Sequence, residues 1–86
     1  MAQYQILYWN DIPAQVKAHE AGGRPVSRRL PERFQIEIDR VAIEEGLTGT
    51  DAYLEQWHWT PRQVREGTAQ EVADALVEEL SSLRPR

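Results

Sequence analysis

The chain has 86 residues, of which 41% are hydrophobic and 28% are charged, and these fractions are typical of a globular domain rather than a disordered chain. It has no cysteine and only two histidines, which excludes disulfides and thiolate chemistry and argues against a metal site. The net charge of −4 and the pI of about 5.1 argue against nucleic-acid binding, because domains that bind nucleic acids usually have a pI above about 9. We therefore expect neither a nucleic-acid partner nor a cofactor.

The length predicts one domain, residues 1–86. The N-terminal segment MAQYQILYW has no basic region, and the longest apolar run is far shorter than the roughly 20 residues that a membrane span needs. We expect a cytoplasmic protein that does not associate with membranes.

Three strands are predicted in the first third of the chain. Tyr4–Trp9 is rich in aromatic and β-branched residues and ends at an Asn-Asp pair that favours a turn. In residues 12–18 apolar and polar side chains alternate, which indicates a half-buried second strand. Gly22-Gly23 suits a tight turn, and Val26–Leu30 alternates again directly after Pro25, so we expect this third strand at a sheet edge.

Two main helices and one short helix are predicted. Residues 30–47 form the first, with Pro31 suited to its first turn and Gly46 placed to end it. Thr50 is the expected N-cap of a short helix. Thr68 and Glu71 match a capping box that starts the last helix. The apolar stripe of that last helix consists of Ala69, Val72, Ala73, Leu76, Leu80 and Leu83.

A fourth extended segment is predicted over residues 56–67, interrupted at Pro61. We expect Trp57 and Trp59 to point to the core, and the alternative is a half-exposed aromatic platform in an interface. His58 between them has no recognisable nucleophile motif, so we assign no catalytic residue. The order βββααβα predicts an α+β fold, in which a mainly antiparallel sheet of about four strands carries two main helices on one face.

The first helix has two apolar faces. One is expected to face the core and consists of Phe34, Ile38, Val41 and Ala42. Ile36 and Ile43 lie roughly on the opposite side. We expect them to contact a second copy of the chain, most simply in a twofold homodimer, or a partner protein. The alternative is that Leu47 and Leu54 cover them within the chain.

Four arginines lie within ten residues, at the third strand and the start of the first helix: Arg24, Arg28, Arg29 and Arg33. This pattern favours a site for a carboxylate or a phosphate, such as the glutamate tail of a folate. The alternative is that these side chains pair with the acidic second half of the chain or are solvated. Arg28 and Arg29 are adjacent on a strand, so they are predicted to lie on opposite faces, and only one of them can join such a site.

Four segments together resemble a small bacterial family labelled "virulence factor": YQILYW (4–9), IPAQV (12–16), LPERF (30–34) and DAYLEQW (51–57). The label comes from a related domain in a larger staphylococcal virulence protein and names a phenotype, so the resemblance transfers no catalytic residue. Stand-alone members are encoded beside enzymes that transfer methyl groups through tetrahydrofolate and corrinoid, which implies an accessory subunit. The first helix of this chain is more apolar than is usual in the family.

We therefore expect a non-catalytic accessory or interaction module that docks on itself or on an enzyme of one-carbon metabolism, through Ile36 and Ile43 and through Trp57 and Trp59. The alternative is a minor enzyme or a binding protein for a small anionic ligand, with the arginine cluster as the binding site.

Overall fold

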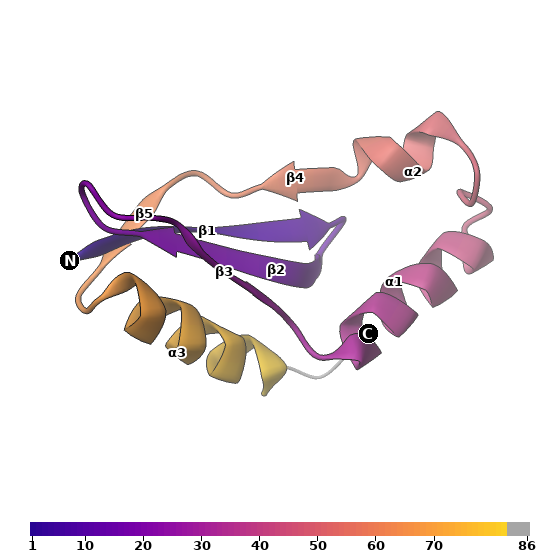
Figure 1. Ribbon diagram of the computed structural model, residues 1–86. Helices are drawn as coiled ribbons and strands as arrows, with labels where there is room; N and C mark the ends of the chain where they lie inside the picture. The colour runs from indigo at the N-terminus through magenta and orange to yellow at the C-terminus, as the bar shows by residue number, and fades with distance from the viewer. Residues whose placement is uncertain (83–86) are drawn as a thin grey trace.

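The N-terminal strand lies at the centre of an antiparallel five-stranded sheet in a computed structural model that describes residues 1–82 (Figure 1). One side of β1 (Ala2–Trp9) pairs with β2 (Ile12–His19), which pairs in turn with β3 (Val26–Arg29). The other elements of the described chain are α1 (Glu32–Glu44), α2 (Asp51–Glu55), β4 (Trp57–Trp59), β5 (Gln63–Arg65) and α3 (Ala69–Ser81). The predicted α+β class and the antiparallel sheet are confirmed.

The predicted fourth strand is two strands, so the prediction of about four strands in the order βββααβα was one strand short. Both β4 and β5 pair with the free side of β1, and Thr60 and Pro61 lie between them. Pro61 has no N–H to donate to a strand ladder. Thr60 bonds to β1 instead: its N–H donates to the carbonyl oxygen of Ile6 at 2.9 Å, and its hydroxyl accepts from the N–H of Ile6 at 2.9 Å. The sheet edge therefore continues past the proline.

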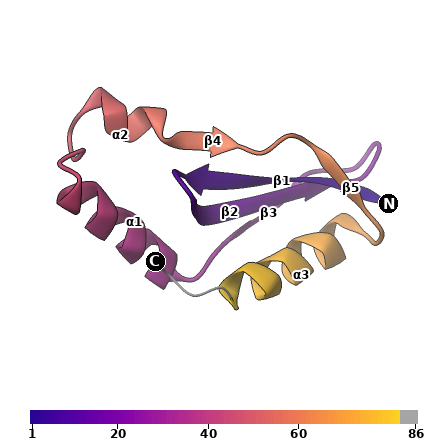
Figure 2. The same ribbon diagram turned by 180° about the vertical axis from the view of Figure 1, so that it is seen from behind.

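One face of the sheet packs against α3. The register places Ile6 opposite Val16 and Val16 opposite Arg28, so these side chains share a face, and Arg28 forms an ion pair with Asp74 of α3. The predicted α3 stripe is buried at Ala69, Val72, Ala73, Leu76 and Leu80, whereas Leu83 lies outside the described residues. In Figures 1 and 2, α1 and α3 lie below β1 and β4, and α1 extends beyond the β1–β2 turn.

Trp9 is the largest fully buried side chain, and it lies beside that turn. Its indole N–H donates to the backbone oxygen of Tyr53 at 2.9 Å, and the two rings lie 5.5 Å apart between centroids. A buried indole needs such a partner for its N–H. Trp9 thereby fixes α2 against the sheet.

Three of the helix ends follow the sequence signals, whereas α1 begins at Glu32, so Pro31 is its N-cap and not part of its first turn as predicted. Gly46, at φ +68°, ends α1, and the N–H of Leu47 reaches back to the carbonyl of Ala42 at 2.8 Å, as in a Schellman motif. The hydroxyl of Thr50 caps α2 by accepting from the N–H of Tyr53. The capping box at the start of α3 is present, with the hydroxyl of Thr68 accepting from the N–H of Glu71 at 3.1 Å.

Two carboxylates of α3, those of Glu71 and Glu79, accept hydrogen bonds that stabilise the helix and its contact with β5. Hydrogen bonds from Thr68 lower the pKa of Glu71, and hydrogen bonds from Arg65 of β5 lower the pKa of Glu79. A lowered carboxyl pKa stabilises the fold above the ordinary pKa of glutamate, and that contribution is lost as the pH falls through the lowered value. We therefore expect the attachment of α3 to weaken in acid.

Replacing the cap residue tests how much of the stability of α3 depends on its first turn. Thr68→Ala leaves the N–H of Glu71 without its side-chain acceptor, and we expect a loss of about 1 kcal/mol in the free energy of unfolding. Urea denaturation followed by circular dichroism measures this loss. Thr48→Ala, at an exposed loop position, is the matched control and should change stability by less than about 0.5 kcal/mol. Equal effects of the two substitutions would contradict the assigned cap.

Candidate functional site

The outer face of α1, defined by Ile36, Arg40 and Ile43, carries two large apolar side chains in solvent. Ile36 is 60% exposed and Ile43 is 69% exposed. Leu54, which the alternative interpretation used to cover them, is itself 64% exposed, and Leu47 packs against the core instead. The core stripe was predicted correctly, because Phe34, Ile38, Val41 and Ala42 are all buried. The structure thus leaves the second stripe uncovered within residues 1–82.

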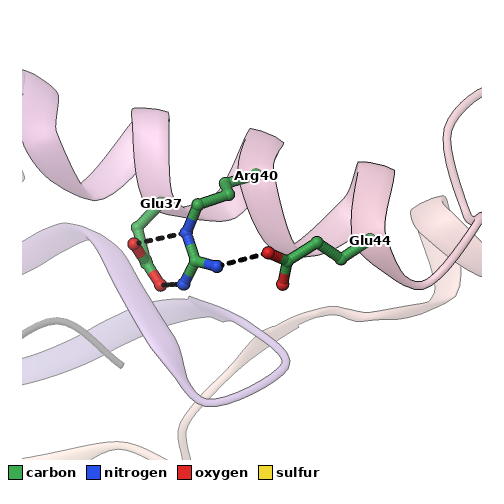
Figure 3. Close-up of polar contacts among 3 residues, drawn as sticks. All are labelled: Glu37, Arg40 and Glu44. Carbon is green, nitrogen blue, oxygen red and sulfur yellow. Dashed lines mark hydrogen bonds and ion pairs between the residues drawn. The ribbon is translucent and has the colours of Figure 1, made fainter.

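Arg40 lies between the two isoleucines along the helix and is held by two carboxylates (Figure 3). Its Nε donates to Oε2 of the buried Glu37 at 3.2 Å, and its Nη1 donates to Oε1 of Glu44 at 2.7 Å. These bonds, first of all those to Glu37, raise the pKa of Arg40. The outer face therefore presents two apolar side chains beside a charge that is already neutralised locally.

A small hollow of about 300 Å³ adjoins the outer face of α1. It is lined by Asp39, Ala42, Ile43, Thr48, Gly49 and Tyr53. The hollow lies between α1 and the segment that leads into α2, and it can receive one apolar side chain from a partner.

The tryptophans on β4 have different environments. Trp57 is half-buried, packs against the core and meets Tyr53 edge-on, with ring centroids 6.3 Å apart, so its predicted core position is confirmed only in part. Trp59 is 42% exposed, so its predicted core position was wrong; it is the last residue of β4, which is an edge strand. His58 points to the other side of β4, where its ring stacks on Tyr8 at 5.9 Å between centroids.

The four arginines do not gather into one site. Arg28 is paired with Asp74 at 3.2 Å. Arg33 donates to the backbone oxygen of Ser81 and lies 5.0 Å from the ring of Phe34. Arg24 is exposed in the β2–β3 turn. Arg28 and Arg29 lie on opposite faces of β3, as predicted, and Arg29 lines a cavity.

That cavity is an open groove of about 630 Å³ between the sheet and the start of α1. Leu7, Gln15 and Arg29 stand opposite one another across β1, β2 and β3 and form one wall. The other lining residues are Ala14, Leu30, Pro31, Glu32, Phe34, Gln35 and Trp57. The size and the mainly apolar lining suit an organic ligand or a peptide side chain, and the lining includes one guanidinium and one carboxylate.

Sequence reasoning missed this groove and the Arg40 network. The network had a signal, because acidic residues three positions before and four positions after an arginine share one helix face. The groove had no such signal, since its lining comes from four strands and the start of a helix, and no local pattern encodes how these elements pack together. Within residues 1–82, no three His, Asp or Glu side chains are placed to hold a metal ion. No helix in that range is long and apolar enough to cross a membrane.

The fold and these surfaces define a small α+β domain with an uncovered apolar helix face and an open groove. The chain belongs to the family described as "Virulence factor", whose pattern matches residues 7–86. The resemblance seen in the sequence is therefore confirmed. No curated protein and no solved structure matches the chain.

Proposed function

We propose that the protein is a non-catalytic interaction module in the cytoplasm and that the outer face of α1 is its principal contact. The exposure of Ile36 and Ile43 carries this proposal. Burying a large aliphatic side chain contributes about 1.5–3 kcal/mol before the cost of association, so two of them on each subunit can sustain a weak, specific contact. Trp59 and the half-buried Trp57 extend the apolar surface along the edge strand β4.

A twofold homodimer is the simplest form of this contact. Ile36 and Ile43 are seven residues apart, so they occupy nearly the same angular position two turns along α1, and a facing copy of the helix can pack between them. The hollow beside Ile43 offers a place for an apolar side chain from that copy.

Lysine at both positions tests this contact. Because both side chains are in solvent, we expect Ile36→Lys/Ile43→Lys to fold normally and to be monomeric at concentrations where the wild type sediments as a dimer. Sedimentation equilibrium and circular dichroism measure the two properties. The matched control is Leu54→Lys/Val64→Lys, which places two lysines at exposed apolar positions outside α1 and should leave the dimer intact. A wild type that stays monomeric would contradict self-association.

The family resemblance supports a partner among the enzymes that transfer methyl groups through tetrahydrofolate or corrinoid. The same variants test this extension. We expect the wild type to retain one such enzyme stoichiometrically from native lysate, and we expect Ile36→Lys/Ile43→Lys to lose it while the control retains it. Recovery of no methyl-transfer enzyme would reject this partner and leave the dimer to be judged by sedimentation.

The groove favours a second candidate, the binding of a small anion. Its support is limited to Arg29, because Arg28 and Arg33 are engaged elsewhere and Arg24 does not line the groove. One guanidinium at an open rim gives weak affinity for a phosphate or for the tail of a folate.

A further inference from the structure

The outer edge of β3 is an unpaired strand edge. Inside the sheet, the N–H of Leu30 donates to the carbonyl of Ala14 at 3.1 Å, and hydrogen-bonded pairs alternate along an antiparallel ladder. Arg28 and Val26 therefore bond inward to β2, whereas the backbone groups of Ser27 and Arg29 point away from the sheet. Within residues 1–82, no strand lies on the outer side of β3 to bond to these outward-pointing groups.

The residues at this edge leave room for a further strand. Pro25 falls in the same outward phase as Ser27 and Arg29, so its missing N–H costs the sheet no hydrogen bond. The carbonyl of Ser27 accepts from Nη1 of Arg28 at 3.1 Å. The N–H of Ser27 and both backbone groups of Arg29 remain for another chain. Both residues are exposed, and their side chains lie on the face of β3 opposite to Arg28 and α3.

The positive charge at this edge of β3 favours the binding of an acidic segment. Residues 21–31 contain three arginines and no acidic side chain, in a chain whose net charge is −4. Asp74 neutralises Arg28, which leaves Arg24 and Arg29 beside the open edge. Opposite charges across neighbouring strands are favourable and fix the register of pairing.

The groove lies directly beside the edge and shares Arg29 with it. A strand added to β3 places alternate side chains on the groove face, where Leu30, Pro31 and Phe34 form an apolar lining. We propose that β3 binds an extended acidic peptide segment of a partner protein by strand addition, with an apolar side chain of that segment in the groove. This site is separate from the outer face of α1.

A display library of random octapeptides, screened against the full chain, tests the proposal. We expect the enriched peptides to be acidic and to alternate acidic with apolar residues. A synthetic copy of the best binder should protect the amides of Ser27 and Arg29 from hydrogen exchange while leaving the amides of β4 and β5 unchanged. Methylating alternate backbone nitrogens of that peptide should abolish binding, because the added strand then loses its donors.

Charge reversal gives the matched pair of variants. Arg29→Glu should lower the affinity for the selected peptide by at least about tenfold. Arg62→Glu, at an exposed arginine on the opposite edge of the sheet, should change that affinity by less than about twofold. Ile36→Lys/Ile43→Lys should bind the peptide as the wild type does, so failure of the proposed function and failure of this site are distinguishable. Enrichment of no peptide, equal effects of the two reversals, or loss of binding in the α1 variant would each overturn the proposal. Displacement of the peptide by millimolar phosphate or free glutamate would also overturn the proposal, because Arg29 would then bind small anions and not specifically a peptide strand.

Discussion

Trp9→Ala should cost about 3–5 kcal/mol in the free energy of unfolding, the largest loss expected from any single substitution in the described chain. The side chain is 0% exposed, and its removal empties the space between the sheet and α2. It also leaves the backbone oxygen of Tyr53 without the indole donor that it has at 2.9 Å. Small domains are stabilised by only about 5–15 kcal/mol, so the variant should lose a large part of its stability. Urea denaturation followed by circular dichroism measures the loss.

Trp59→Ala is the control for that experiment, because it removes the same side chain from an exposed edge position. It should cost less than about 1 kcal/mol. If the two substitutions were equally costly, the assignment of Trp9 to the core and of Trp59 to the surface would be wrong.

Ile38→Ala should destabilise the protein by about 2–4 kcal/mol, whereas Ile36→Ala, two residues away on the same helix, should change stability by less than about 0.5 kcal/mol. Ile38 is fully buried and Ile36 is mostly in solvent. Thermal unfolding at low protein concentration measures both effects without a contribution from self-association.

The same pair of variants separates folding from association. At high protein concentration, Ile36→Ala should lower the fraction of dimer although its monomer is as stable as the wild type. A loss of monomer stability in Ile36→Ala comparable to that of Ile38→Ala would show that the outer face of α1 supports the fold itself.

The sequence predicted those elements whose signals are local. Gly46 readily adopts the left-handed backbone that ends α1, and Thr68 and Glu71 cap each other within one turn, so the end of α1 and the start of α3 follow from neighbouring residues. The two stripes of α1 follow from helical periodicity alone. The alternation of Arg28 and Arg29 follows from the period of a strand.

Features that depend on distant residues were not predictable in the same way. The division of the last extended segment into β4 and β5 depends on Thr60 meeting Ile6, which lies 54 residues away. The exposure of Trp59 depends on where the sheet ends rather than on its own neighbours. The dispersal of the arginine cluster depends on the position of Asp74 in a helix that begins 40 residues after β3 ends.

The central position of β1 has a consequence for the order in which the molecule forms. The hairpin of β1 and β2 and the following β3 are adjacent in sequence, so they can close early and at little entropic cost. The far side of β1 must wait for residues 57–65, which lie about fifty residues further along the chain. During synthesis at about 5–20 residues per second, this side of β1 has no partner strand for several seconds. The backbone groups of Ala2, Tyr4 and Ile6 point to this side, so they are the groups of a nascent chain that are most open to pairing with the wrong strand.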